Sequence, residues 1–346
     1  MENITHIQNP LDGRLKPALP QIVDRHGRTF NYLRLAVNEF CNLRCIYCMP
    51  EEGVPFQSKN KLLSTDEIFR LISIASQLGV SKIRFTGGEP LLRNDIPELI
   101  KFSKSQNSIE SVHLTTNGLL LEENLSQLEL AGLSGINISL DTLNHEKFKK
   151  ITRRNGLEKV LKGLKKAMNS SIQSVKLNVV ALRDFNDNEL MDFVALTKDN
   201  NITVRFIELM PFDSHQIWKT GKFYKADHIV EDLQRLSSQL QPVEGSRTEH
   251  YIFKIENAKG KVAVIPAYSR NLCSACNRIR ITADGKLLNC LYSRDEINLR
   301  DAMRAGDSDQ KIQSMIQGSF LNKHKDGWGA QDSKGGYRES MTQIGG

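Results

Sequence analysis

The sequence contains no apolar run that approaches the roughly 20 residues a membrane helix requires. Its first residues, MENITHIQNPLDGRLKP, lack the apolar core of a signal peptide, and no solenoid-type repeat recurs along the 346 residues. We therefore expect a cytoplasmic protein with no membrane partner. The composition, 39% hydrophobic and 25% charged, is that of an ordinary globular protein, and the length suits one large domain or two modest ones.

The chain also lacks a run of consecutive basic residues, although its net charge is +7 and its pI is near 9.0. A basic arm that binds nucleic acid would concentrate lysine and arginine in one stretch. The basic residues are instead spread along the chain. A solvated, lysine-rich surface is therefore favoured over a nucleic-acid interface, and no nucleic-acid partner is expected.

Cysteine is absent from residues 49–272, and all six cysteines fall in two short groups on either side of this gap. A cytosolic chain keeps its thiols reduced, so metal binding or catalysis is favoured over disulfides. The first group, Cys41, Cys45 and Cys48, has the spacing C-x3-C-x2-C. Three thiolates leave one iron of a four-iron cluster open to a small chelating molecule. A zinc site that lacks its fourth ligand is the alternative interpretation.

The second group, Cys273, Cys276 and Cys290, has the spacing C-x2-C-x13-C. It is interpreted as a second cluster with one open iron, and the alternative is a structural zinc site with an outside ligand such as His250. Arg278 and Arg280 follow directly and share one face of a strand, because side chains alternate along a strand. Two arginines beside a metal site suit a phosphate-bearing ligand.

The first two thirds of the chain alternate between strand-like and helix-like segments. Strands are expected at residues 33–37, 82–88, 112–116, 136–140, 175–180 and 204–209, and a helix is expected to begin after a cap at Ser64 or Thr65. Six strands alternating with helices predict an α/β fold, a partial (β/α)6 TIM-like barrel. Right-handed crossovers would place the carboxyl ends of the strands on one rim.

Beyond about residue 215 the pattern changes to that of an α+β extension, which we expect to close the open side of the barrel. Its expected elements are a helix at 225–240, two strands around the turn at 257–260, and a hairpin with Asp284-Gly285 at its tip. From about residue 318 the chain is rich in glycine and polar residues, and we expect it to be loosely structured unless the body holds it. The predicted divisions are an N-terminal extension at 1–30, the barrel at 31–215 and the C-terminal extension at 216–346.

Cations interrupt four of the predicted barrel strands. Inner strands of parallel sheets are normally almost entirely apolar, yet these carry Arg34, Lys82, Arg84, Lys176 and Arg205. Unpaired buried charge is costly, so these side chains either face outward with solvated tips or converge on an anion inside the barrel. Together with Arg278 and Arg280, convergence would suit a highly charged ligand such as a nucleoside triphosphate.

Several motifs together resemble a known family. The first cysteine group with Tyr47, followed after the next strand by Thr86-Gly-Gly-Glu-Pro90, resembles the radical S-adenosylmethionine (SAM) superfamily. The two cysteine groups, NRIR at 277–280, TTNG at 115–118, SLD at 139–141, RFIELM at 205–210 and the terminal Gly-Gly resemble the GTP 3′,8-cyclases of molybdenum cofactor biosynthesis. This resemblance extends from about residue 12 to the end of the chain.

The resemblance implies a radical SAM lyase that converts GTP to 3′,8-cyclo-7,8-dihydro-GTP. A 5′-deoxyadenosyl radical would take hydrogen from the ribose 3′ carbon, and the sugar radical would attack carbon 8 of guanine. The implied cofactors are SAM and two [4Fe–4S] clusters, one on each cysteine group. One departure is visible, because Asn38-Glu39-Phe40 precede Cys41 where family members usually carry Thr or Ser, then Asp and a basic residue.

The resemblance also assigns roles to individual residues. SAM would contact Gly88, Ser139, Met210 and the backbone of Tyr47. GTP would contact Arg34, Arg84, Thr115, Lys176, Arg278, Ile279 and Arg280. Gly345 and Gly346 would reach into the active site and act in catalysis together with Arg278 and Arg280, although a disordered tail is the ordinary interpretation of such an end.

The partners implied are GTP, an electron donor of flavodoxin or ferredoxin type, and the next pathway enzyme, cyclic pyranopterin monophosphate synthase, as product acceptor. A homodimer stays open. Two rival functions are a radical enzyme that modifies a peptide or RNA, and a non-catalytic zinc protein. The in-strand cations and the NRIR segment favour GTP over a peptide, which needs no such set of positive charges.

Overall fold

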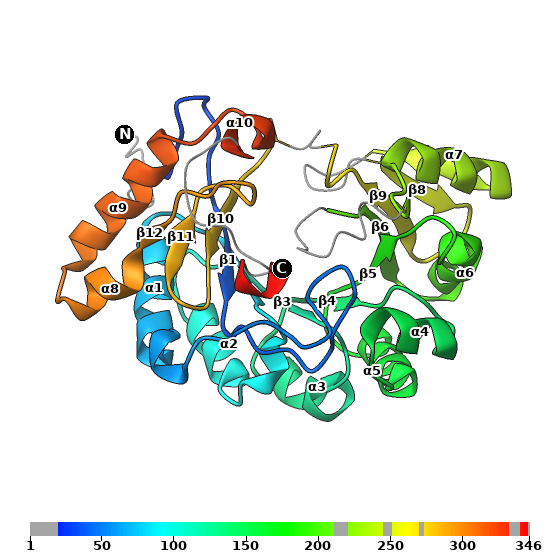
Figure 1. Ribbon diagram of the computed structural model, residues 1–346, viewed down its shortest axis with the longest axis horizontal. Helices are drawn as coiled ribbons and strands as arrows, with labels where there is room; N and C mark the ends of the chain where they lie inside the picture. The colour runs from blue at the N-terminus through cyan, green and yellow to red at the C-terminus, as the bar shows by residue number, and fades with distance from the viewer. Residues whose placement is uncertain (1–19, 211–220, 245–250, 270–272, 332–339, 345–346) are drawn as a thin grey trace, which may run out of the picture.

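The computed structural model describes residues 20–210, 221–244, 251–269, 273–331 and 340–344, and one curved sheet runs through this part of the chain (Figure 1). Its strands are β1 (Tyr32–Ala36), β2 (Lys82–Thr86), β3 (Ser111–Thr116), β4 (Gly135–Ser139), β5 (Ser174–Ala181), β6 (Ile202–Glu208), β7 (Leu240–Val243), β8 (Tyr251–Ile255), β9 (Lys261–Ile265), β10 (Arg278–Ile281), β11 (Lys286–Leu288) and β12 (Ile297–Asn298). Their order across the sheet is β12-β11-β10-β1-β2-β3-β4-β5-β6-β9-β8-β7.

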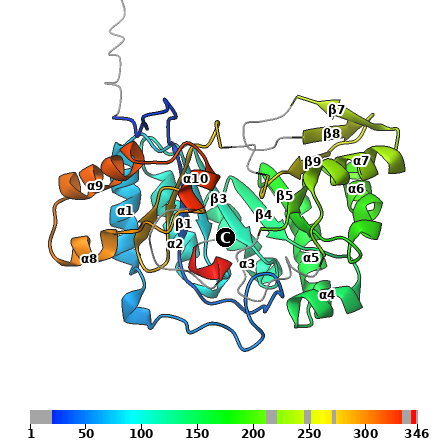
Figure 2. The ribbon, with the colours of Figure 1, turned by 45° about the horizontal axis from the view of Figure 1, so that its top comes forward.

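The predicted partial barrel is confirmed, since β1 to β6 are parallel neighbours in chain order. Helices cover its outer face (Figures 1 and 2). They are α1 (Thr65–Gln77), α2 (Ile96–Lys104), α3 (Leu121–Leu130), α4 (His145–Thr152), α5 (Leu157–Met168) and α6 (Leu190–Asp199), with short 3-10 turns at Lys59–Lys61, Pro90–Leu92 and Asp187–Glu189. Helix α1 begins with a capping box in which Ser64 and Glu67 bond each other's backbone N–H, as the predicted cap requires.

The C-terminal extension adds strands to both ends of the barrel sheet. Strand β10 pairs in parallel with β1, and β9 pairs in parallel with β6. Antiparallel strands continue beyond each of them, so that β10 to β12 lie on one side of the molecule and β8 and β9 on the other (Figure 1). The predicted hairpin is confirmed, with Gly285 at its tip in the left-handed region at φ 79°. The extension flanks the open side of the barrel with its helices α7 (Ala226–Leu236), α8 (Leu299–Arg304), α9 (Asp309–Leu321) and α10 (Gly327–Gln331).

The body of the protein holds the described parts of the chain beyond residue 318. Helix α9 continues to Leu321, and its Phe320 lies 4.4 Å from Phe30, centroid to centroid. Ser340 and Thr342 are almost completely buried, and a 3-10 turn spans Met341–Gln343. The glycine-rich composition therefore did not reveal how firmly this segment packs.

The main hydrophobic core lies between the sheet and the outer helices and includes side chains from all six barrel strands. Its members at alternate positions, such as Leu33 and Leu35 of β1, are fully buried. The residues between them point to the opposite face of the sheet, as the strand period requires. None of the helices in the described parts of the chain is long and apolar enough to cross a bilayer.

Candidate active site

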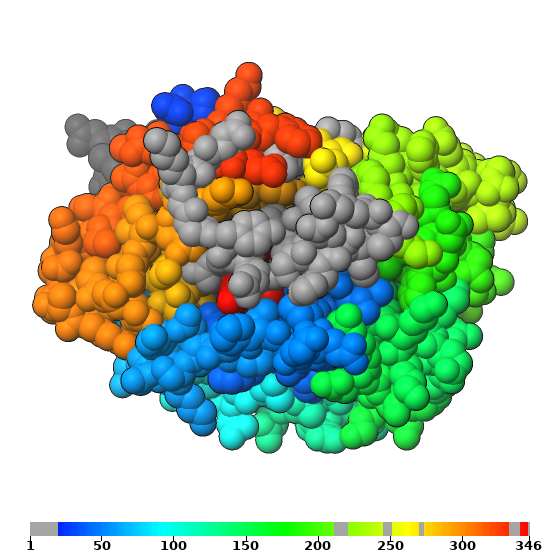
Figure 3. Space-filling view, in the orientation of Figure 1, coloured from blue at the N-terminus to red at the C-terminus, as the bar shows by residue number. Residues whose placement is uncertain are grey.

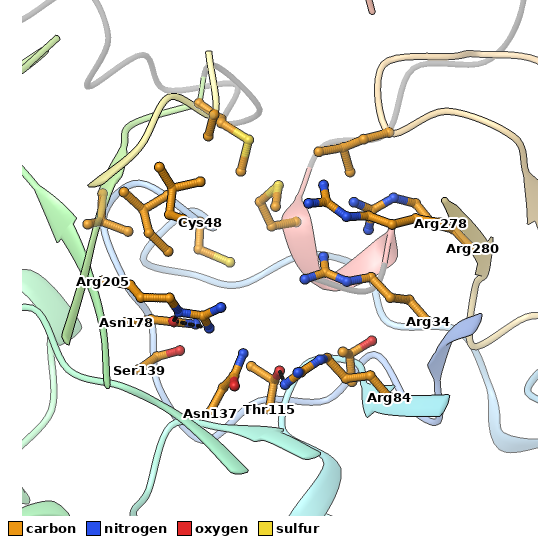
Figure 4. A pocket seen from close by; sticks show the side chains of 18 of the residues that line it. Arg34, Cys48, Arg84, Thr115, Asn137, Ser139, Asn178, Arg205, Arg278 and Arg280 are labelled. Carbon is orange, nitrogen blue, oxygen red and sulfur yellow. Dashed lines mark hydrogen bonds between the residues drawn. The ribbon is translucent and has the colours of Figure 1, made fainter. Parts of the chain in front are cut away.

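A cavity of about 470 Å³ occupies the inside of the curved sheet and receives side chains from every barrel strand and from the C-terminal extension. The six cysteines, although separated by residues 49–272, all line this one cavity. Figure 4 shows arginines from β1, β2 and β10 on one side of it, Arg205, Asn178 and Ser139 on the other, and Cys48 above the second group in this view. The two predicted metal sites therefore belong to one site.

The cations inside the strands converge on this cavity, and the alternative of solvated outward tips is wrong. The lining includes Arg34, Lys82, Arg84, Lys176, Arg205, Arg278 and Arg280. Register explains the convergence, because Arg34 is paired with Arg84 on β2 and with Arg280 on β10. One residue pair earlier on the same face, Tyr32 is aligned with Lys82 and Arg278. Because alternate residues of each strand face the cavity and the strands are in register, the cations form two rows across β10, β1 and β2.

The crowding of these cations leaves a net positive field in the cavity. Burial, followed by the charges of Arg34 and Arg278, lowers the pKa of Arg280 to about 9. Burial and the nearby Arg84 and Lys82 lower the pKa of His113 to about 2, so this ring stays neutral. Within the described structure Nη1 of Arg280 has no hydrogen-bond partner. An anion with several oxygens would satisfy such groups.

Tyr32 organises the arginines and was not singled out from the sequence. Its hydroxyl accepts a hydrogen bond from Nε of Arg84 at 2.5 Å, and the same guanidinium donates to Oγ1 of Thr115 at 3.3 Å. Burial would raise the pKa of Tyr32, but Arg84 and Arg34 lower it well below its usual value. The predicted residue Thr115 therefore faces the cavity beside Arg84 (Figure 4).

The first cysteine triad lies on a loop that follows β1 and is anchored on α4. Backbone N–H groups of Arg44 and Ile46 donate to the carbonyls of Thr152 and Ile151 at 3.0 and 2.9 Å. Burial and then the neighbouring Cys41 raise the pKa of the Cys48 thiol to about 12. Burial, followed by Cys48 and Asp141, raises that of Cys45 well above its ordinary value. A bound cation is therefore needed to stabilise the thiolate forms of these cysteines.

Both triads fit iron–sulfur clusters better than single ions. In the part of the chain that the structure describes, no three His, Cys, Asp or Glu side chains lie close enough to bind one metal ion. A zinc ion requires four ligands around one point, whereas each cysteine on a four-iron cluster binds a different iron. His250, suggested as an outside zinc ligand, lies outside the described residues.

The Gly87-Gly88-Glu89 segment after β2 is locked against the residues that precede Cys41. The N–H groups of Gly88 and Glu89 donate to the carbonyls of Asn38 and Phe40 at 2.9 and 2.7 Å. These contacts use backbone atoms, so the unusual Asn38-Glu39-Phe40 sequence is compatible with them. Burial raises the pKa of the Glu89 carboxyl to about 7, and this group accepts bonds from Thr116 and from the N–H of Asn117, both at 2.7 Å.

Replacing Gly88 with Ala is expected to displace the first cysteine loop. A Cβ at this position would lie 2.1 Å from the Phe40 carbonyl oxygen and 2.5 Å from that of Glu39. Such overpacking against backbone typically costs about 1–3 kcal/mol. We expect Gly88→Ala to lower the free energy of unfolding by about that amount and to reduce iron content after anaerobic reconstitution.

The matched control is Gly318→Ala in α9, where a Cβ would meet nothing within 4 Å. Because alanine is favoured in helices, this variant should gain up to about 1 kcal/mol. Denaturant unfolding and iron analysis of both variants check the prediction. Wild-type stability and wild-type iron content in Gly88→Ala would contradict it.

The second cysteine triad lies where β10 and β11 approach the cavity, and two cations from distant segments pack around it. Nη1 of Arg28 donates to the Cys273 carbonyl at 2.9 Å. Lys323 is 3% exposed and donates from Nζ to the Asn289 carbonyl. Burial would raise the pKa of the Cys276 thiol, but Lys323, Arg278 and Arg280 lower it below its ordinary value.

The four residues implied for SAM binding all line the cavity near the first triad: Tyr47, Gly88, Ser139 and Met210. The hydroxyl of Tyr47 donates to Oδ2 of Asp141 at 2.6 Å, and Oδ1 of Asp141 accepts from the N–H of Val180 at 2.8 Å. Burial raises the pKa of Asp141 to about 6. The hydroxyl of Tyr47 is therefore already engaged by Asp141.

Ile279 lies apart from the other residues implied for GTP. Its side chain is buried in the main core, on the opposite face of β10 from Arg278 and Arg280. Only its backbone could therefore contact a ligand. Gly345 and Gly346 lie outside the described residues, but Met341 and Thr342 just before them line the cavity.

Sequence reasoning missed several residues that line the cavity. Asn137 and Asn178 sit at in-strand positions of β4 and β5 and could have been found by the same rule that located the cations. Asn178 accepts two bonds from Arg205, at 2.9 Å from Nε and 2.5 Å from Nη2 (Figure 4). No local signal pointed to Lys323, which reaches the cavity only through tertiary packing.

Comparison with known sequences and structures agrees with this geometry. The radical SAM superfamily matches residues 35–197, and the family described as Molybdenum Cofactor Synthesis C matches residues 202–327. A GTP 3′,8-cyclase of Chlorobaculum tepidum is 45% identical over 325 residues, 94% of this chain and 97% of that protein. Another, from Desulforamulus reducens, is 41% identical over 94% of this chain and 100% of that protein.

A longer relative and a solved structure extend the comparison. The molybdenum cofactor biosynthesis protein 1 of Bos taurus is 44% identical over 88% of this chain, which spans 48% of that longer protein. The structure of Streptococcus suis SuiB bound to S-adenosylmethionine has a TM-score of 0.56 at 16% identity, over 84% of this chain and 69% of that one, a likeness of fold alone. With full-length relatives above 40% identity, the chain belongs to the GTP 3′,8-cyclase family of the radical SAM superfamily.

Proposed function

We propose that the protein converts GTP to 3′,8-cyclo-7,8-dihydro-GTP, the reaction named by its relatives. The observation that carries the proposal is the one cavity in which two cysteine triads flank two rows of aligned cations. A triphosphate needs such a set of cations, and a radical reaction needs its substrate enclosed beside the radical source. A neutral peptide would not balance the net positive charge of this cation set.

The superfamily implies a [4Fe–4S] cluster and SAM, and we propose that Cys41, Cys45 and Cys48 hold that cluster. When bound, these groups supply the electron and the 5′-deoxyadenosyl radical that begin the reaction. The chain's own contribution is positional. Gly88 lets the backbone of its segment approach the cysteine loop, and Tyr47, Ser139 and Met210 would line the SAM position between this loop and the strands.

We further propose that Cys273, Cys276 and Cys290 hold a second [4Fe–4S] cluster that faces the guanine. The support is their shared cavity and the cations Lys323, Arg278 and Arg280 that surround Cys276. Net positive surroundings stabilise thiolates and a negatively charged cluster.

The triphosphate would lie among the arginines. We propose GTP contacts with the side chains of Arg34, Arg84, Thr115, Lys176, Arg278 and Arg280 and with the backbone of Ile279. Arg280 in particular brings an unpaired N–H group and two arginine neighbours, Arg34 and Arg278, whose mutual repulsion an anion would relieve. Binding of GTP would thus be strengthened by electrostatic strain already present in the free protein.

The proposed division of the chain is an N-terminal extension at 1–30, the barrel at 31–215 and the C-terminal extension at 216–346. Neither the barrel nor the C-terminal extension has a complete site, since each of these two parts supplies one triad and part of the cation set. An electron donor of flavodoxin or ferredoxin type and an acceptor enzyme, cyclic pyranopterin monophosphate synthase, are the protein partners that this reaction would need.

The test of the proposed function is anaerobic incubation of reconstituted protein with GTP, SAM and dithionite, followed by product analysis. The expected products are 5′-deoxyadenosine and 3′,8-cyclo-7,8-dihydro-GTP. A brown protein that contains iron and sulfide would exclude the zinc alternative. Cleavage of SAM without change in GTP would instead favour a radical enzyme with another substrate.

The C-terminal end is expected to act on GTP without binding either cluster. Ser340 donates a hydrogen bond to the Cys48 carbonyl at 2.9 Å, and Met341 and Thr342 line the cavity. The described residues that precede the two final glycines thus lie beside the cavity, and glycine permits close backbone approach to a ligand. Deleting Gly345 and Gly346, or appending residues after Gly346, should suppress the cyclised product while iron content and unfolding stay unchanged.

Gly345→Ala should also lower product formation, although alanine is normally tolerated at a free terminus. An amino-terminal tag of the same length serves as the control and should leave turnover unchanged. Product analysis and iron content are measured on all variants. Unaltered turnover with a carboxy-terminal tag would contradict the prediction and indicate that the end of the chain has no role in catalysis.

A further inference from the structure

The excess positive charge of the protein is concentrated on α4 and α5. Residues 145–166 contain nine Lys or Arg and two Asp or Glu, a net charge of +7, which equals the net charge of the whole chain. All other residues together are therefore neutral overall. Few basic residues are consecutive in the sequence, but α4 and α5 together carry the excess of positive over negative charge. A surface of this kind attracts an acidic partner.

These charges face solvent and are mostly uncompensated. The cations Lys149, Lys150, Arg154, Lys159, Lys162 and Lys165 are exposed, and no ion pair joins them to an acidic side chain in the described residues. Their neighbours Lys147, Arg153 and Lys166 do pair, with Glu189 at 2.8 Å, Glu51 at 3.8 Å and Glu122 at 3.1 Å. Six of the nine cations in residues 145–166 thus have no acidic partner in the described structure, and we define the exposed side of residues 147–165 as the basic face.

The basic face lies directly behind the first cysteine loop. Besides the backbone bonds from Arg44 and Ile46 to the last turn of α4, Nη1 of Arg153 donates to the carbonyls of Arg44 and Met49 at 3.1 and 3.2 Å. In the space-filling view the blue surface of the cysteine segment borders the green surface of this region (Figure 3). A hollow between them is lined by Glu51, Glu146, Lys147, Lys149, Lys150, Arg153, Asp184 and Phe185.

We propose that the basic face is the docking site of an acidic protein that delivers single electrons to the first iron–sulfur centre. The donor would lose one electron and the centre held by Cys41, Cys45 and Cys48 would gain it, with no bond made and no proton moved. Backbone bonds from Arg44 and Ile46 to the end of α4 connect this face to the loop that carries Cys45 and Cys48. The inference rests on the proposed function, because cleavage of SAM at the first centre consumes an electron.

The composition of the face favours a protein over a nucleic acid or a membrane. Sites for single-stranded nucleic acid interleave basic and aromatic side chains, yet the only aromatic residue in 145–166 is Phe148, and it is 3% exposed. A membrane-binding helix must offer its apolar face to the lipid. The apolar faces of α4 and α5 are instead buried in the protein, through residues such as Leu157 and Leu164.

The test is the triple variant Lys149→Glu/Lys150→Glu/Arg154→Glu, compared with a control of equal charge change on other helices and exposed positions, Lys101→Glu/Lys198→Glu/Lys311→Glu. SAM cleavage is measured with reduced flavodoxin and, separately, with dithionite, and binding of flavodoxin, RNA and anionic vesicles to the wild type and both variants is measured directly. Because charge steering governs association, we expect the flavodoxin-driven rate of the first variant to fall by about tenfold or more, with a flattened salt dependence. Dithionite-driven cleavage and product formation should stay near wild type.

The outcomes separate this inference from the proposed function. An equal loss in the control triple, or an undiminished flavodoxin-driven rate in the first variant, overturns the docking site. Retention of RNA or of anionic vesicles by the face, with no binding of flavodoxin, overturns it as well. If the proposed function is wrong, the wild-type protein will form no cyclised product even with dithionite as the reductant.

Discussion

Replacing Cys41, Cys45 and Cys48 together with Ala is expected to abolish cleavage of SAM and to remove about half of the iron, because one of two equal clusters is lost. The physical reason is that these three thiols share one loop at one end of the cavity, and burial penalises their charged forms unless a cluster balances them. The backbone anchors of the loop on α4 do not involve the sulfur atoms, so the fold should survive.

The corresponding change at Cys273, Cys276 and Cys290 should also remove about half of the iron, since it deletes the other cluster, but it should leave some cleavage of SAM. Cyclised product should be absent, because the triad that would face the guanine is gone. Iron and sulfide content, 5′-deoxyadenosine and cyclised GTP are measured on both variants. Retained SAM cleavage in the first variant would overturn the assignment of its triad.

The second large effect is expected when the aligned arginines are removed. Hydrogen bonds to charged groups contribute about 1.5–3 kcal/mol each, and every 1.4 kcal/mol is about tenfold in affinity. Each of the substitutions Arg34→Ala, Arg84→Ala, Lys176→Ala, Arg278→Ala and Arg280→Ala should thus weaken GTP binding by roughly 10-fold to 100-fold. SAM binding should change much less, since its proposed contacts lie elsewhere in the cavity.

Arg280→Met distinguishes a binding role from a structural one. Methionine keeps most of the buried volume and removes a charge that Arg34 and Arg278 repel. The ligand-free protein should therefore unfold with unchanged or increased free energy, while GTP affinity falls. Calorimetric binding of GTP, guanosine and SAM, with denaturant unfolding, provides the measurements. Guanosine binding to the wild type as tightly as GTP would refute the triphosphate site.

Local sequence patterns located many of the residues that line the cavity. The spacing of Cys41, Cys45 and Cys48 predicts a cluster loop because ligand geometry is encoded in neighbouring residues. The period of two places Arg278 and Arg280 on one face of a strand, and both do line the cavity. Apolar strands interrupted by single cations such as Arg84 predicted an interior anion site because buried charge is costly without a partner.

The tertiary structure alone decided which distant segments meet. Nothing local in RIRI indicates that β10 joins the sheet beside β1, yet that pairing aligns Arg280 with Arg34 and Arg84. Lys323 and Ser340 reach the two cysteine triads for the same reason. Strand order and packing depend on which sheet edges and surfaces remain available after the rest has folded. That is a property of the whole chain, whereas ligand spacing and strand period are properties of a few residues.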